Sequence, residues 1–107
     1  MSDINNVTIT GHIGSDPEMK YFDSGSVVVN FSVAIDEWQG KEKGSKTIWI
    51  DCRAWGQKAE FIGDYAKKGS LVMVDGRLSV ESWTAQDGTK RSKTLVLVNE
   101  IKVVDKK

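Results

Sequence analysis

The stretch Thr47-Ile48-Trp49-Ile50-Asp51-Cys52-Arg53-Ala54-Trp55 alternates in polarity with the two-residue period of a β-strand. One face carries the small and apolar side chains that suit a core: Ile48, Ile50, Cys52 and Ala54. The other face carries charged residues and two tryptophans, Trp49 and Trp55. The pattern therefore predicts a half-buried strand that presents flat aromatic surface to water. Because tryptophan is mostly buried on average, the alternative is that another part of the fold covers one or both indoles.

A chain of 107 residues is long enough to form a hydrophobic core without the help of disulfides or bound metal ions. We therefore expect one domain, residues 1–104, followed by a C-terminal stub, 105–107. Its hydrophobic content of 39% and charged content of 28% are ordinary for a soluble globular protein. The apolar runs are only strand-length, and the first residues lack the regions of a signal peptide. The single cysteine, Cys52, lies on the core face and is expected to be a small buried hydrophobe. These features predict a protein of the reducing cytoplasm.

The net charge of the chain does not indicate a nucleic-acid partner. The 15 Lys and Arg residues balance 15 Asp and Glu residues, so the chain has no overall positive field to attract a polyanion. Any binding of nucleic acid must therefore rest on local basic clusters and on stacking.

The remaining patterns predict an all-β chain with one helix. Period-two segments bounded by turn residues predict strands at about 7–13, 27–38, 47–55, 71–83 and 94–104. The core phase of the fourth strand is expected to include Val72, Val74, Leu78 and Val80. Helical spacing of Ala59, Ile62, Tyr65 and Ala66 predicts a helix that ends at Gly69, with Lys67 and Lys68 in its last turn. Three strands, a helix and two strands is the element order of the OB-fold, a five-stranded barrel.

All four tryptophans fall in the solvent phase of the predicted strands: Trp38, Trp49, Trp55 and Trp83. Basic residues lie on the same strands or on the hairpins that join them: Lys41, Lys43, Lys46, Arg53, Lys90, Arg91 and Lys93. Aromatic platforms interleaved with cations suit sequence-tolerant binding of a single nucleic-acid strand, at roughly 1–3 kcal/mol per stacked base. The lysine pair Lys67-Lys68 is explained about equally well by helix capping and by phosphate binding.

Several segments resemble bacterial single-stranded DNA-binding proteins in their order and spacing. They are Asn6-Val7-Thr8-Ile9-Thr10-Gly11-His12-Ile13-Gly14-Ser15-Asp16-Pro17-Glu18, Lys20-Tyr21, Asn30-Phe31-Ser32-Val33-Ala34, Trp55-Gly56, Lys67-Lys68-Gly69-Ser70, Asp75-Gly76-Arg77-Leu78 and Trp83-Thr84. The resemblance implies an OB-fold, usually a homotetramer, that wraps single-stranded DNA in replication, repair and recombination. It implies neither an enzyme nor a cofactor, and it places the protein in the cytoplasm at the nucleoid.

The family's stacking positions fall on the four tryptophans, Trp38, Trp49, Trp55 and Trp83. The candidate phosphate contacts are Lys46, Arg53, Lys67, Lys68, Lys90, Arg91 and Lys93. Among these, the Lys67-Lys68 pair and Arg91 match basic positions of the family.

The sequence also departs from the family pattern. Gln57 stands where many members have lysine, and Asp51 and Glu81 stand where better-known members are basic, which is expected to weaken or redirect phosphate contacts. The family's Gly/Gln/Pro-rich linker and acidic C-terminal tip are missing, either naturally or by truncation. Partner proteins that read such a tip are therefore not expected to bind this chain.

Two other functions remain open at this point. One is a primosome-type OB protein whose main role is helicase loading, although retention of all four stacking positions speaks against it. The other is a carbohydrate-binding module, because exposed tryptophans also stack on sugar rings. The only histidine, His12, has no partner at metal-ligand spacing, and no nucleophile–base pair or phosphate loop indicates an enzyme.

Overall fold

The computed structural model describes residues 3–104, so the expected stub at 105–107 lies outside the described residues. Its elements are β1 (Val7–Ile13), β2 (Glu18–Tyr21), β3 (Val27–Trp38), β4 (Ser45–Trp55), α1 (Gly56–Tyr65), β5 (Leu71–Thr84) and β6 (Lys90–Val103). The predicted fold class is confirmed. The five long strands form the barrel, α1 follows β4, and β2 is a short addition that pairs only with β3 in the described chain.

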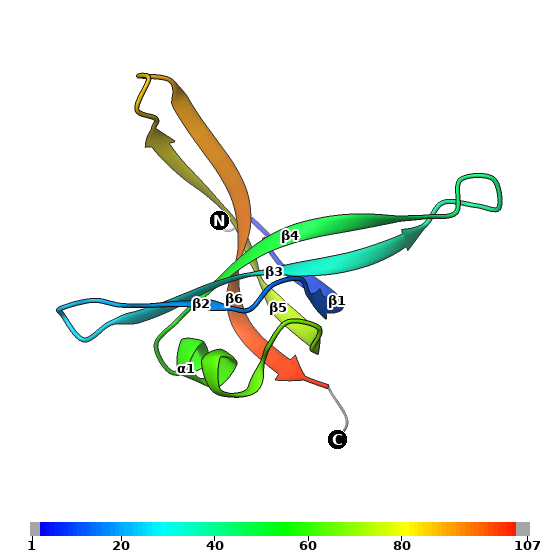
Figure 1. Cartoon of the computed structure of the whole chain (residues 1–107). Coiled ribbons are helices and arrows are strands. Elements are labelled where there is room, and N and C mark those ends of the chain that lie inside the picture. Colours follow the sequence, from blue (N-terminus) through cyan, green and yellow to red (C-terminus); the bar gives the residue numbers. More distant parts are fainter. Residues whose placement is uncertain (1–2, 105–107) are drawn as a thin grey trace.

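The barrel closes because β1 pairs on both sides. The strand order is β1-β5-β6-β4-β3-β2, and β1 also pairs with β3 at His12 and Ile13. The pairing of β4 with β6 is parallel, and the other pairings are antiparallel. Figure 1 shows α1 at one end of the barrel, where it packs against β2, β3, β4 and β6.

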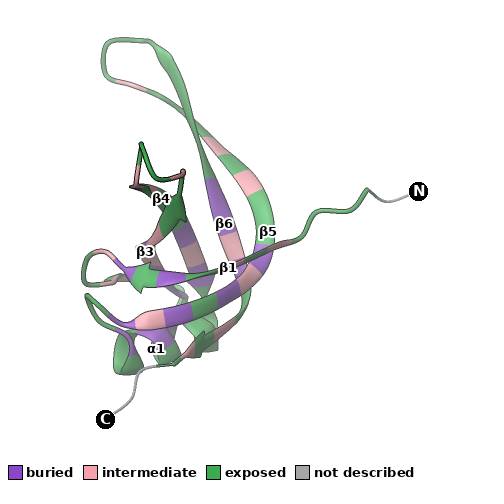
Figure 2. Ribbon diagram, turned by 90° about the vertical axis from the view of Figure 1, so that its right-hand side faces the viewer, coloured by how far each residue is buried: buried purple, intermediate pink, exposed green. Residues whose placement is uncertain are grey.

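Long strands extend beyond the barrel as two-stranded arms. Figure 1 shows the β3–β4 hairpin and the β5–β6 hairpin leaving the barrel in different directions, and the shorter β2–β3 hairpin leaving on a third side. The core lies where the strands cross, and buried residues alternate with exposed ones along them (Figure 2). Its fully buried members are mainly β-branched residues, which suit strands: Ile13, Val29, Val33, Val72, Val74 and Val96, with Ile62 from α1.

The prediction that Leu78 and Val80 belong to the core is wrong. Their side chains are 50% and 61% exposed, although Val72 and Val74 on the same face are buried. The reason is that β5 leaves the barrel after Gly76, where the register with β6 shifts, and nothing within residues 3–104 forms a second layer over the arm beyond it. An added Cβ at Gly76 would lie 2.1 Å from the carbonyl oxygen of Leu97, so the close approach of the two strands requires glycine there.

The predicted end of the helix is also wrong. The helix ends at Tyr65, and Ala66 has extended backbone with φ −108°. Lys67 and Lys68 therefore lie in the turn before β5 rather than in the last helical turn. That turn has its own hydrogen bonds, since the backbone N–H of Lys67 donates to Ser70 Oγ and that of Lys68 donates to Asp16 Oδ1. Tyr65, expected on the buried face, is exposed, because Ala59 and Ile62 form the buried stripe of α1 and the Tyr65 ring lies beside it, against the ring of Phe61.

Candidate nucleic-acid interface

The tryptophans all lie on the outer surface, as the strand phase predicts. Their exposed fractions are 67% for Trp38, 60% for Trp49, 52% for Trp55 and 44% for Trp83. Such exposure is unusual for indoles, which are mostly buried in folded proteins. The alternative, that another part of the chain covers them, therefore does not hold within residues 3–104.

The structure distributes these indoles over two arms and the barrel surface between them. Trp49 and Trp55 share the outer face of β4 and lie six residues apart, which is about 20 Å along an extended strand. Trp38 ends β3 and is paired with Ser45 at the outer end of the β3–β4 arm. Trp83 lies near the end of β5, on the other arm. They form a series of separate platforms and not one aromatic cluster.

The indole of Trp49 lies against the backbone of Gly14. A Cβ added to Gly14 would lie 2.1 Å from Cζ3 of the Trp49 ring, so only glycine leaves room for the ring in this position. The turn after β1 therefore supports one side of the indole and leaves the rest exposed. Support of this kind limits the rotamers of an exposed platform before any ligand binds.

Trp55 has an aromatic neighbour that sequence reasoning missed. The ring of Phe22, just after β2, is stacked with the Trp55 ring at a centroid separation of 6.4 Å and an interplanar angle of 21°. Phe22 is 47% exposed. The only signal in the sequence was an aromatic residue directly before the turn Asp23-Ser24-Gly25, which by itself indicates nothing about a partner on β4.

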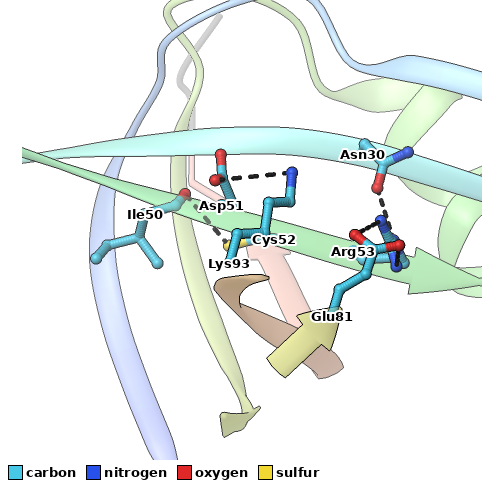
Figure 3. A network of polar contacts seen from close by, with 7 residues as sticks. All are labelled: Asn30, Ile50, Asp51, Cys52, Arg53, Glu81 and Lys93. Carbon is cyan, nitrogen blue, oxygen red and sulfur yellow. Dashed lines mark hydrogen bonds and ion pairs between the residues drawn. The ribbon is translucent and has the colours of Figure 1, made fainter. Parts of the chain in front are cut away.

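Arg53, a predicted phosphate contact, is held by other side chains (Figure 3). Its Nε donates to Asn30 Oδ1 at 2.8 Å, and its two terminal nitrogens donate to the Glu81 carboxylate at 3.1 and 3.3 Å. The guanidinium thus joins β3, β4 and β5. Hydrogen bonding from Arg53 lowers the pKa of Glu81 from its ordinary value, with smaller contributions from the charges of nearby lysines.

Asp51, the other acidic residue at a position expected to be basic, also lies next to a predicted phosphate contact. Asp51 lies 3.9 Å from the Nζ of Lys93, and Figure 3 shows this pair beside the Arg53 network. Asp51, Lys93 and Arg53 border an open polar depression of about 330 Å³ that also includes Asn30, Ser32 and the turn residues Ser15 and Asp16. The two carboxylates thus lie next to two of the candidate cations, an arrangement that the sequence alone did not reveal.

The other predicted basic residues take three positions. Lys90 and Arg91 face Thr84 and Trp83 across the β5–β6 arm, and together they border a shallow hollow. Lys46 is paired with Glu37 in the β3–β4 arm. Lys67 and Lys68 lie in the turn between α1 and β5. The structure therefore brings Lys90 and Arg91 to one tryptophan, and Arg53 and Lys93 to one depression, but it does not gather all seven cations in one patch.

Cys52 is buried on the inner face of β4, as predicted. Burial, with the charge of Asp51 as the second cause, raises the pKa of its thiol to about 12, so the thiol stays protonated at neutral pH. Within residues 3–104, no group of three or more His, Cys, Asp or Glu residues could hold a metal ion. Nor is any helix in this part of the chain long and apolar enough to cross a membrane.

Comparison with known proteins identifies the family. The family model described as "Single-strand binding protein family" matches residues 4–104. The chain belongs to this family. Its members are DNA-binding proteins that are not enzymes, so the resemblance noted in the sequence and the expectation of a non-enzymatic protein are both confirmed.

Relatives match over nearly the full chain. "Single-stranded DNA-binding protein 1" of a Synechocystis strain is 40% identical over 97% of this chain and 86% of its own length. The protein of the same name from Xylella fastidiosa is 35% identical over 100% of this chain and 82% of its own length. A solved structure, "Plasmodium falciparum SSB complex with ssDNA", superposes with a TM-score of 0.89 at 25% identity and covers 98% of both chains. This likeness supports the barrel described above.

Proposed function

We propose that this chain binds single-stranded DNA with little regard to base sequence. Bases stack on Trp38, Trp49, Trp55 and Trp83, and nearby cations contact the phosphates. The observation that carries the proposal is that all four indoles are exposed on the outer surface of the strands, where a folded protein would ordinarily cover them. The names of the relatives agree with it, and the similar Plasmodium falciparum structure is a complex with single-stranded DNA.

A single strand suits this surface better than a duplex. Bases in a duplex are already stacked on one another, whereas a single strand can turn its bases outward onto aromatic rings. Trp49 and Trp55 are about 20 Å apart along β4, and Trp83 lies on the other arm, so a flexible strand is needed to reach several platforms. Since the net charge is zero, stacking must supply a large share of the affinity.

The proposal includes a cellular role and a domain assignment. We place the protein in the cytoplasm at the nucleoid, where it covers single strands exposed in replication, repair and recombination. Residues 1–104 would act as one DNA-binding domain. The contacts to phosphate are assigned to Lys46, Arg53, Lys67, Lys68, Lys90, Arg91 and Lys93.

We also propose that the protein assembles as a homotetramer. In the described chain, β1 meets β3 only through His12 and Ile13, so most of one edge of β1 has no partner strand. Unpaired edges of this kind are commonly covered by another chain. The partly exposed Met73 on the outer face of β5 and the exposed Leu78 and Val80 add apolar surface that assembly would bury.

The test is a titration of intrinsic tryptophan fluorescence with oligo-dT at several salt concentrations. We expect strong quenching and an affinity that falls linearly on a log–log plot as salt rises, because phosphate contacts release counterions. A neutral oligosaccharide, titrated in parallel, should leave the emission unchanged. Unchanged emission at saturating DNA would refute the proposal, and saturable quenching by the sugar would favour a carbohydrate-binding module.

A further inference from the structure

The β2–β3 hairpin carries an aromatic ring directly beside a proposed stacking platform. Phe22 and Trp55 are close to parallel, with an interplanar angle of 21°. Their centroid separation of 6.4 Å is near the wide end of the 4.5–7 Å range of aromatic pairs, so the two rings do not cover each other's faces completely. Both rings remain about half exposed. Together they form a wider aromatic surface than Trp55 alone.

The residues around this pair lie on one face of three adjacent strands. Lys20 on β2 is directly opposite Val28 on β3, and Val28 is directly opposite Trp55 on β4. Residues directly opposite one another in antiparallel strands point to the same face. Val28 is nevertheless only 4% exposed, although it belongs to the outer face of β3. On this outer face, Val28 is therefore covered, and the exposed groups on either side of it are the Trp55 indole and the cationic side chain of Lys20.

The position of Phe22 is set by the hairpin turn. Its backbone N–H donates to the carbonyl oxygen of Ser26 at 2.9 Å, and its own carbonyl oxygen accepts from the N–H of Gly25 at 2.9 Å. Gly25 has a φ of +95°, which favours glycine and closes the turn. The ring is therefore presented from a hydrogen-bonded turn and not from a loose loop, so little ordering is needed before it can bind a flat ligand.

We propose that Phe22 is a fifth base-stacking residue, which together with Trp55 holds a nucleobase and directs the DNA strand from β4 across the β2–β3 hairpin. Lys20, on the same face, lies where the phosphate of that nucleotide would pass. This inference rests on the proposed function, and it adds a residue and an exit path that the four tryptophans do not define. A nucleotide fits the site because it combines a planar base for the two rings with an adjacent, negatively charged phosphate for Lys20.

The competing explanation is that Phe22 only covers Val28 and supports Trp55. Two substitutions separate the explanations. Phe22→Leu keeps an apolar cover and removes the aromatic face, whereas Phe22→Tyr keeps the ring. We expect Phe22→Leu to weaken binding of oligo-dT between about 5-fold and 150-fold, the range for one stacked base, and Phe22→Tyr to bind like the unmodified protein. Tyr65→Leu, which changes an exposed aromatic on α1, is the matched control and should change nothing.

Contact is tested directly on the unmodified protein with photo-crosslinking. An oligonucleotide of 5-iodo-deoxyuridine is irradiated in the complex, and the crosslinked residues are identified by mass spectrometry. Crosslinks at Phe22 together with the loss in Phe22→Leu support the inference. Unmodified affinity in Phe22→Leu, or crosslinks at the tryptophans with none at Phe22, overturns it and leaves the proposed function intact. Failure of the unmodified protein to bind oligo-dT would instead overturn the proposed function itself.

Discussion

The guanidinium of Arg53 and the carboxylate of Glu81 form a two-fold hydrogen-bonded pair, 28 positions apart in the sequence, that ties the C-terminal end of β4 to the β5–β6 arm. The side chain of Arg53 is only 21% exposed, and that of Glu81 is 41% exposed. Planar two-bond pairs of this kind are among the stronger ionic contacts in proteins. A cation proposed to meet phosphate is thus already occupied by a carboxylate of the same chain.

Glu81→Gln is expected to tighten binding of single-stranded DNA. When a DNA phosphate binds Arg53 in place of Glu81, the freed carboxylate takes up a cation from solution. This uptake offsets part of the counterion release that favours DNA binding. Without that carboxylate, the slope of log affinity against log salt should steepen by about 0.7, the value for one phosphate contact on a single strand. Fluorescence titrations with oligo-dT over a range of salt measure both quantities.

The control for that variant is Glu60→Gln, which makes the same change in net charge on α1, away from the Arg53 network. We expect it to leave the salt slope as it is. Weaker binding by Glu81→Gln would show instead that the pair serves mainly to set the angle of the β5–β6 arm.

The same pair predicts a pH dependence. Because hydrogen bonding from Arg53 lowers the pKa of Glu81, the carboxyl group should titrate below its ordinary value of 4.5. A lowered pKa in the folded state means that the pair contributes stability above the unfolded pKa, and this contribution is lost as the pH falls through the folded one. Carboxyl NMR titration measures the midpoint, and Arg53→Gln should move it back toward the ordinary value. A midpoint of 4.5 in the unmodified protein would contradict the structure.

Trp49→Ala and Trp83→Ala are each expected to weaken binding by about 1–3 kcal/mol, because each removes one stacking platform. The fold should persist, since both indoles are largely exposed and neither is part of the core. Titration with oligo-dT and thermal unfolding followed by circular dichroism test the two parts separately. If either variant loses its cooperative unfolding transition, that indole is structural and its assignment as a platform fails.

The parts of the fold that the sequence predicted well are those where alternation reflects burial directly. On β4, Cys52 and Ala54 are buried and Trp49 and Trp55 exposed, because that strand keeps one face to the core along most of its length. On β5 the same alternation wrongly predicted a buried Leu78, since this residue continues the apolar pattern beyond the point where the barrel ends. Periodicity shows which residues share a face, but not whether another layer covers that face.

In the candidate site, too, some features could be predicted from the sequence and others could not. The exposed tryptophans could be found from strand phase, because they lie on the face opposite the core side chains and nothing in residues 3–104 covers them there. The partners of Arg53 and Trp55 could not, because Glu81 and Phe22 come from distant segments and meet them only through the sheet register. Contacts between residues far apart in sequence depend on the closed topology, which no single stretch encodes.

Gly14→Ala tests whether the position of the Trp49 indole matters. The added methyl group would meet the ring at 2.1 Å, so the indole must move from its place on the turn. We expect weaker binding of oligo-dT and a shifted tryptophan emission. In a Trp49→Ala background the same change should have no further effect on affinity, since the two residues act through one platform. Additive losses in the double variant would show that Gly14 affects binding by another route.

Assembly is tested on the outer face of the barrel. Met73 points outward from β5, opposite Thr10 on β1 and Lys102 on β6, and it is partly exposed in the described chain. If other copies cover this face in a homotetramer, Met73→Lys places an unpaired charge in an interface, which is costly, and the assembly should dissociate at micromolar concentration. Light scattering gives the mass of each species. Tyr65→Lys on α1 is the control and should keep the mass of the unmodified protein. A monomeric mass for the unmodified protein would refute the tetramer and strengthen the helicase-loading alternative, because a lone barrel offers few platforms for covering long single strands.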